Sequence, residues 1–134
     1  MERLFTRQEA EDALPHIAPL LWELQRLNEA VVNSSRQLAA VQTATAGNGH
    51  GLDSDMAHAR QEQAQATAQM QRLLDQVAEM GVEVKDVSEG LIDFRSEMDG
   101  RIVYLCWKLG EEHVDWWHEL DTGFAGRQPL AQEK

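Results

Sequence analysis

The chain has 134 residues, of which 43% are hydrophobic and 26% are charged. This length and this balance predict one soluble globular domain that folds without disulfide bonds. The formal net charge is −11, and the 12 lysines and arginines are scattered along the chain. Because binding to phosphates depends on clustered basic side chains, we expect no nucleic-acid partner and no membrane partner.

The start of the chain and its cysteine content indicate a cytoplasmic protein. Residues 1–16 are charged from the second position and lack the apolar run of a signal peptide. No apolar stretch approaches the roughly 20 residues that a membrane span requires. Cys106 is the only cysteine, which excludes an internal disulfide and suits a reducing compartment.

A first helix is predicted within residues 6–45. Thr6 and Glu9, three residues apart, form a capping-box pattern at its start. Pro15 and Pro19 follow, and proline is costly inside a helix but suits a first turn. We therefore expect a short opening helix, a break, and a long helix that starts near Pro15.

A second helix is predicted over residues 53–80, after a loop indicated by the glycines and polar residues of 45–54. In both helices apolar residues recur at alternating intervals of three and four, which is the heptad seam of a coiled coil. Ser34 and Gln63 are the polar exceptions. The two series are Ile17, Leu20, Leu24, Leu27, Val31, Ser34, Leu38 and Val41, then Met56, Ala59, Gln63, Ala66, Met70, Leu73, Val77 and Met80.

The two seams match when the helices are folded back antiparallel about the loop. Val41 then faces Met56, and Ser34 falls opposite Gln63. A lone buried amide costs about 1–3 kcal/mol, so the shared layer predicts that these two polar residues hydrogen-bond to each other. The resulting hairpin would be roughly 35–40 Å long. Extra apolar residues occur only at its base, where we expect the rest of the chain to pack: Leu14, Leu21, Trp22, Leu74 and Ala78.

Residues 82–120 carry the patterns of strands. Residues 82–87 alternate, as a half-buried strand does. Residues 90–94 and 101–107 are rich in branched and aromatic side chains, and the polar stretch 95–100 between them ends in Asp-Gly. This arrangement predicts a β-hairpin.

The state of residues 113–120 decides which side chains share a face. A helix would bring Asp115 and His118 to one face together with Glu111, whereas a strand would place Trp116 and His118 on one side. The density of tryptophan and valine, and the glycine turn before the segment, favour a strand.

The predicted fold class is therefore α+β. A long antiparallel helical hairpin, or coiled-coil arm, carries a small antiparallel β-meander over residues 82–120 at its base, within a single domain. Residues 121–134 are expected to form a loop, with Phe124 and Leu130 tucked against the sheet.

Four segments resemble an uncharacterised bacterial family known as domain of unknown function 2203: residues 5–24, 81–94, 100–111 and 117–130. The resemblance covers nearly the whole chain outside the tip of the hairpin. It implies no assigned activity, so no catalytic residue can be transferred. The positions that it implies share a role are Gly90, Asp93, Cys106, Trp107, Gly110, Glu111, Trp117, His118, Asp121, Gly123, Gly126 and Arg127.

The acids and histidines near the C-terminus suggest a metal or acid–base site. His118 and Asp121, joined by Glu111 or Asp93, would supply one imidazole and two carboxylates, a set that suits zinc, manganese or non-haem iron. The same groups could also shuttle protons near neutral pH. The structural alternative, which we favour, is that His118 bonds Asp121 or a backbone carbonyl and fixes the turn into the tail.

Arg127 and Cys106 also have functional and structural interpretations. Arg127 follows two glycines and could clamp a carboxylate or phosphate, but an internal pair with Asp121, Glu119 or Asp93 is favoured. Cys106 lies in the middle of a predicted strand, where a buried packing role is favoured over that of a nucleophile.

Three tryptophans, Trp107, Trp116 and Trp117, could line a ligand pocket, although aromatic residues in a small sheet usually fill the core. Trp116 and Trp117 are adjacent, so in a strand they face opposite sides. One of them should be partly exposed, which is a signal of an interface.

The leading functional interpretation is a non-enzymatic interaction or scaffold module that uses its helical hairpin and forms a homodimer or binds another protein. The alternative is a small enzyme that either binds a metal or uses acid–base chemistry, with a divalent metal as the candidate cofactor of the first version. Its candidate site comprises Asp93, Glu111, Trp117, His118, Asp121 and Arg127, with His118, Asp121 and Glu111 as candidate metal ligands.

Overall fold

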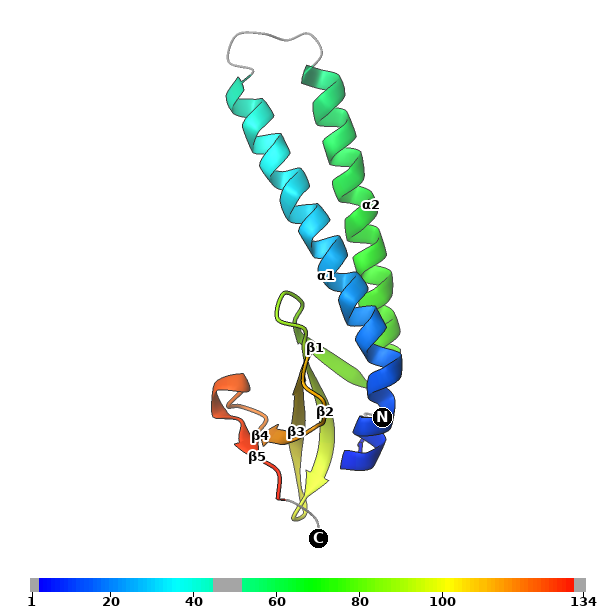
Figure 1. The fold of residues 1–134 in the computed structure, drawn as a ribbon, viewed down its shortest axis with the longest axis vertical. Helices are drawn as coiled ribbons and strands as arrows, with labels where there is room; N and C mark the ends of the chain where they lie inside the picture. Colours follow the sequence, from blue (N-terminus) through cyan, green and yellow to red (C-terminus); the bar gives the residue numbers. More distant parts are fainter. Residues whose placement is uncertain (1–2, 45–51, 132–134) are drawn as a thin grey trace.

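The computed structural model describes residues 3–44 and 52–131, with side chains over 3–40 and 54–131. Two long helices form an antiparallel hairpin, and a five-stranded antiparallel sheet lies at its base (Figure 1). This confirms the predicted α+β fold class. The elements are α1 (Arg7–Ala44), α2 (Leu52–Glu79), β1 (Val82–Asp86), β2 (Leu91–Met98), β3 (Arg101–Lys108), β4 (Trp116–His118), a 3₁₀ turn η1 (Phe124–Gly126) and β5 (Gln128–Pro129).

The start of α1 is the predicted capping box. The Thr6 hydroxyl accepts a hydrogen bond from the Glu9 backbone N–H at 3.0 Å, and the Glu9 carboxylate accepts one from the Thr6 N–H at 2.9 Å. The two bonds satisfy donors that the first helical turn would otherwise leave unpaired.

The predicted break near Pro15 is wrong, because α1 runs without interruption through Pro15 and Pro19. Both prolines are exposed, so the carbonyl groups that they leave without a donor lie where water can hydrate them. On the opposite side Leu14, Ile17 and Leu21 are buried against the rest of the protein. The burial of these side chains, at about 1.5–3 kcal/mol each, offsets the cost of the prolines.

The seam of the hairpin follows the predicted heptad positions. Every seam residue whose side chain the structure describes is buried or half-buried. Gln63 does meet the serine layer, but its Nε2 donates to Ser35 Oγ at 2.8 Å rather than to the buried Ser34. The antiparallel register is therefore right to within one residue. The predicted contact of Val41 with Met56 lies outside the described side chains.

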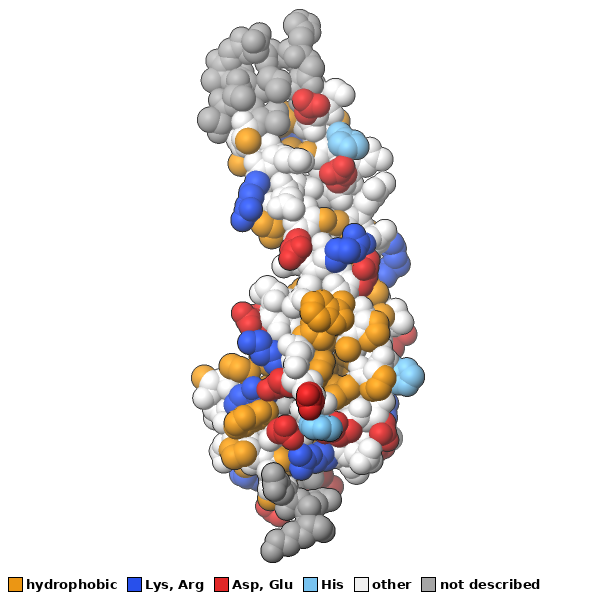
Figure 2. Space-filling model, viewed as in Figure 1, with side chains coloured by type: hydrophobic (Ala, Val, Ile, Leu, Met, Phe, Trp, Pro, Cys, Tyr) orange, Lys and Arg blue, Asp and Glu red, His pale blue; other side chains and the backbone are white. Residues whose placement is uncertain are grey.

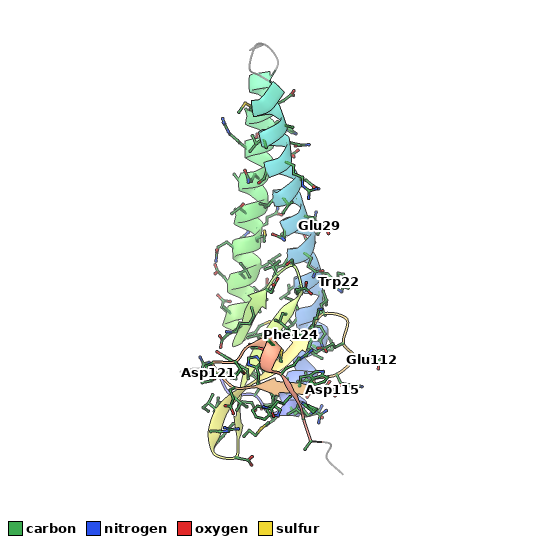
Figure 3. All side chains as sticks on the ribbon, turned by 90° about the vertical axis from the view of Figure 1, so that its left-hand side faces the viewer. Trp22, Glu29, Glu112, Asp115, Asp121 and Phe124 are labelled. Atoms are coloured by element: carbon green, nitrogen blue, oxygen red, sulfur yellow. The ribbon has the colours of Figure 1, made fainter. Side chains whose placement is uncertain are left out.

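Trp22 departs from the packing expected at the base. Its side chain is 61% exposed and points away from α1 (Figure 3). Hydrophobic side chains on the face seen in Figure 2 gather around the base of the arm, while the upper arm on that face is mostly polar.

The sheet is a meander in the order β1-β2-β3-β4-β5. The turn between β2 and β3 consists of Asp99 and Gly100, both with positive φ (52° and 79°), as a two-residue hairpin turn requires. The predicted β-hairpin is confirmed, because β2 and β3 pair antiparallel about this turn. Its strands are longer than expected, since β2 continues through the polar residues to Met98.

Of the strand predicted over residues 113–120, only Trp116–His118 is confirmed, as β4. The tail was expected to be a loop, yet Gln128 and Pro129 pair with the outer edge of β4 as a fifth strand. A proline is tolerated there because an edge strand needs donors on one side only. Leu130 packs against the core as expected, whereas Phe124 is 42% exposed.

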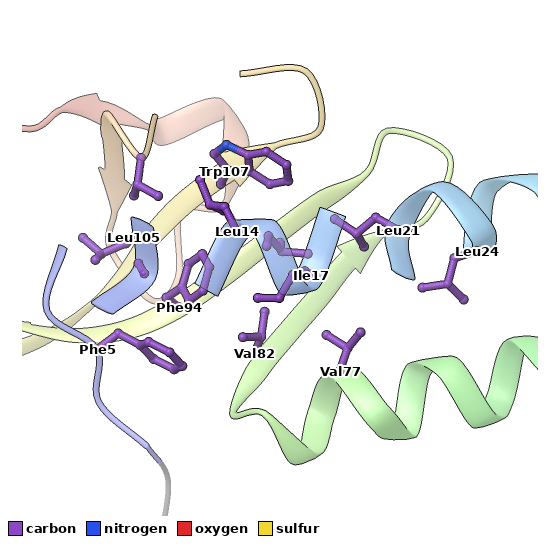
Figure 4. Close-up of a cluster of buried hydrophobic side chains, with 13 residues drawn as sticks. Phe5, Leu14, Ile17, Leu21, Leu24, Val77, Val82, Phe94, Leu105 and Trp107 are labelled. Carbon is purple, nitrogen blue, oxygen red and sulfur yellow. The ribbon is translucent and has the colours of Figure 1, made fainter. Parts of the chain in front are cut away.

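The two faces of the sheet have different roles. The inner face packs on the first turns of α1 and forms the hydrophobic core (Figure 4). Its members include Ile92, Phe94, Leu105 and Trp107 from the sheet, and Leu14, Ile17 and Leu21 from α1. The outer face is polar and lies beneath the C-terminal tail.

Candidate functional site

Strand register brings three chemically active side chains together on the outer face. Asp93 of β2 lies directly opposite Cys106 of β3, and His118 of β4 lies opposite Tyr104, two residues along β3. Asp93, Cys106 and His118 are only 2%, 0% and 2% exposed. An acid, a thiol and an imidazole from three strands are therefore buried side by side.

His118 is held at both ring nitrogens. Its Nε2 lies 3.0 Å from each carboxylate oxygen of Asp93, and its Nδ1 lies 2.7 Å from the carbonyl oxygen of Glu119. A carbonyl oxygen only accepts hydrogen bonds, so Nδ1 carries the proton that is donated to Glu119. The bond to a backbone carbonyl was expected, but the carboxylate partner is Asp93 and not Asp121.

The low polarity around these groups changes their acidity. Burial raises the pKa of Asp93, although the charges of His118 and Lys85 act in the opposite direction. Burial also raises the pKa of the Cys106 thiol to about 12, and the nearby Asp93 charge adds to this effect. Cys106 is thus a protonated thiol at neutral pH, which fits the packing role favoured from the sequence over that of a nucleophile.

A cleft of about 290 Å³ opens onto the Asp93–His118 pair. The outer sheet face forms its floor and the tail forms its wall. Its lining consists of Lys85, Leu91, Asp93, Tyr104, His118, Leu120, Asp121, Thr122, Gly123 and Phe124. Asp121 is exposed at the rim, and Phe124 lies in front of the sheet (Figure 3).

Glu111 and Arg127 form a separate pair that fastens the tail. Arg127 Nη1 and Nη2 donate to the two carboxylate oxygens of Glu111 at 3.1 and 3.0 Å, and the backbone N–H of Lys108 donates to the same carboxylate at 2.7 Å. The guanidinium also stacks over Trp116 and Phe124, at 4.8 and 4.6 Å from the ring centroids. Arg127 pairs internally as favoured, but with Glu111 rather than with the expected acids.

The structure does not bring the predicted metal ligands together. Glu111 is engaged by Arg127, and Asp121 lies at the rim of the cleft. Among the described residues, the acids, histidines and cysteines that form a compact group are Asp93, Cys106 and His118, whose ligand atoms all lie within 4.8 Å of one another. Trp117 of the candidate site belongs to the opposite face, where it packs against the core.

Comparisons with known proteins identify a family but no activity. Within the described parts of the chain, no helix combines the length and the apolar character needed to cross a membrane. Searches of curated proteins and of solved structures find no similar protein. The model of a family described as "Uncharacterized conserved protein (DUF2203)" matches residues 3–130. The chain belongs to this family.

Proposed function

We propose that the protein is a non-enzymatic interaction module that forms a homodimer through its helical hairpin. The observation that supports this proposal is a lateral face of the hairpin that is covered by the sheet at the base and exposed above it. This face is referred to below as the sheet-side face.

Heptad spacing traces the sheet-side face along α1. At the base, Leu14 and Leu21 of this face are buried under the sheet. The β-sheet region covers this face only as far as Gln25, whose side-chain amide donates to the Ser88 carbonyl oxygen at 2.9 Å. One heptad beyond Gln25 is Val32, an aliphatic side chain that is 41% exposed.

On α2 the same face carries Ala57, Arg60, Ala64 and Thr67, all of them exposed. Among these residues and Val32, Arg60 is the only charged one. Small uncharged side chains allow helices to approach to about 8–10 Å between axes, so the face suits packing against another helical surface.

A second copy of this chain is the partner that we favour. Two copies that each carry a net charge of −11 repel each other over most orientations. The named residues of the sheet-side face above Gln25 include no acid, so a contact between two such faces brings no acids together there. A twofold axis makes one patch complementary to itself. A cytoplasmic location fits the single free thiol.

The oligomeric mass tests the proposal. Light scattering on untagged protein at micromolar concentration should give twice the 15.1 kDa mass of one chain. Ala64→Arg should give single chains because it places charge in the interface. Gln69→Arg, which lies on the opposite exposed flank of the same helix, is the control and should remain dimeric. A wild-type protein with the mass of one chain would overturn the proposal.

A second candidate function, a metal-dependent or acid–base enzyme, is favoured by one observation. The Asp93–His118 pair lies at the floor of a cleft, where a bound molecule can exchange a proton with it. Lys85 and Asp121 at the lining offer one charge of each sign to orient a polar substrate. Metal content decides whether this pair acts through a metal.

A further inference from the structure

We infer that Asp93, Cys106 and His118 form a binding site for one zinc-like divalent ion. The inference does not depend on the oligomeric state, and it concerns a different part of the molecule from the helical hairpin. It keeps His118 and the alternative acid Asp93 from the set expected from sequence, and Cys106 takes the place of Asp121 and Glu111.

The spacing of the three groups is close to that of a zinc site. Zinc–ligand bonds of about 2.0–2.3 Å in a tetrahedron place ligand atoms roughly 3.3–3.6 Å apart. Here Asp93 oxygens lie 3.0 Å from His118 Nε2, and all ligand atoms, including the sulfur of Cys106, lie within 4.8 Å of one another. Side-chain adjustments of about 1 Å would close the set around an ion.

The orientation of His118 calls for a positive species beside Nε2. Nδ1 donates its proton to the Glu119 carbonyl, so Nε2 is the ring nitrogen that faces the two oxygens of Asp93. Two acceptors 3.0 Å apart repel unless a proton or a cation lies between them. A histidine fixed by a backbone carbonyl at its other nitrogen is also the arrangement that orients metal-bound imidazoles.

The donor set selects the kind of ion. A sulfur, an imidazole nitrogen and a carboxylate suit zinc, whereas magnesium and calcium prefer oxygen ligands. When the ion binds, a zinc–sulfur bond replaces the S–H bond of Cys106, and its proton leaves to solvent together with any proton shared by Asp93 and His118.

Access and local charge are compatible with such a site. Asp93 and His118 line the cleft, so a fourth ligand can approach from solvent, as in zinc sites with an open position. Lys85 lines the cleft, and its charge is paired with Glu83. Arg127 donates to the Cys106 carbonyl oxygen at 3.4 Å, but its charge is paired with Glu111. The guanidinium therefore adds little repulsion toward a bound ion.

Elemental analysis and cobalt substitution test the inference on untagged protein. We expect about one zinc per chain and the release of protons when metal-free protein is titrated with zinc. Addition of Co²⁺ to metal-free protein should give a thiolate-to-cobalt charge-transfer band. Cys106→Ser and His118→Asn should each weaken zinc binding by at least about tenfold. His113→Gln removes an exposed histidine from the same segment and should leave binding unchanged.

Two results would overturn the inference. One is a folded wild-type protein, checked by circular dichroism, that binds neither zinc nor cobalt. The other is a Cys106→Ser variant that keeps the wild-type affinity and cobalt spectrum. If His118→Asn does not fold, the Cys106→Ser variant still decides the outcome, because serine fits the space of the buried cysteine.

Discussion

The carboxylate of Asp93 and the imidazole of His118 bond to each other across an intervening strand. Asp93 belongs to β2 and His118 to β4, and β3 lies between them with the small Cys106 side chain beneath the bond. The pair joins strands that share no backbone ladder. The site and the packing of the short strand β4 consequently depend on the same two residues.

Removing one member of this pair should destabilise the protein strongly. In Asp93→Ala the imidazole of His118 keeps its burial but loses its carboxylate, and breaking such a buried pair costs about 3–5 kcal/mol. Urea unfolding measures the change. Asp121→Ala, an exposed acid at the rim of the cleft, is the control and should change the free energy of unfolding by less than about 0.5 kcal/mol. Equal losses in both variants would contradict the assigned pairing.

The Glu111–Arg127 pair should matter more than an exposed pair of the same kind. Arg127→Lys loses the two-point contact with the carboxylate and the stacking on Trp116, so we expect a loss of about 1–3 kcal/mol and earlier proteolysis of the tail. The matched control is Arg7→Lys, whose partner Asp115 is 55% exposed. That variant should lose less than about 1 kcal/mol. Similar losses would show that the tail is held in another way.

Gly90 should tolerate no side chain. Its φ is +65°, and an added Cβ would lie 2.5 Å from Leu109 Cβ, so Gly90→Ala combines backbone strain with a steric clash. Gly100 has a φ of +79° but nothing within 4 Å of an added Cβ. We expect Gly100→Ala to cost about 1–2 kcal/mol from strain alone, and Gly90→Ala to cost clearly more. Thermal unfolding of the two variants makes the comparison, and an equal cost would mean that the loop before β2 shifts freely.

Glu83 should contribute to the loss of stability in acid. Burial works against its ionisation, but hydrogen bonds from Lys85 and Tyr104 and the charges of Lys85 and Arg95 outweigh burial and lower its pKa below the ordinary value of 4.5. A carboxylate with a lowered folded pKa stabilises the protein above its unfolded pKa, and this contribution is lost as pH falls through the folded pKa.

Glu83→Gln checks this expectation. Its stability deficit relative to wild type should be full at about pH 7 and should shrink as the pH falls below about 4. Chemical unfolding at several pH values gives the difference directly. A deficit that stays constant down to low pH would mean that the charge of Glu83 is not what stabilises β1.

Local periodicity explains why the hairpin was predictable. The seam positions repeat along each helix, so their spacing specifies both helices and their register without knowledge of distant residues. The continuity of α1 through Pro15 was not predictable in this way, because the packing of Leu14, Ile17 and Leu21 against a remote sheet overrides the local penalty. The fifth strand likewise depends on an unpaired edge of β4 that no local pattern reveals.

The site was only partly predictable for the same reason. Partners such as Asp93 and His118 are 25 residues apart, and strand alternation gives a face but not a partner. One signal was available: a two-residue turn at Asp99 and Gly100 places Asp93 opposite Cys106. The polar character of residues 95–98 hid this register, because these residues do not look like part of a strand. His118 then joined the pair through β4, whose register the sequence does not specify.

Native mass spectrometry of untagged protein is the sharpest test of the proposed dimer and zinc site, because one spectrum reports both chain number and bound metal. We expect two chains of 15.1 kDa carrying two zinc ions, and Ala64→Arg should reduce the species to one chain and one zinc. A wild-type species of one chain would contradict the proposed dimer. A metal-free species, whatever its chain number, would contradict the zinc site at Asp93, Cys106 and His118.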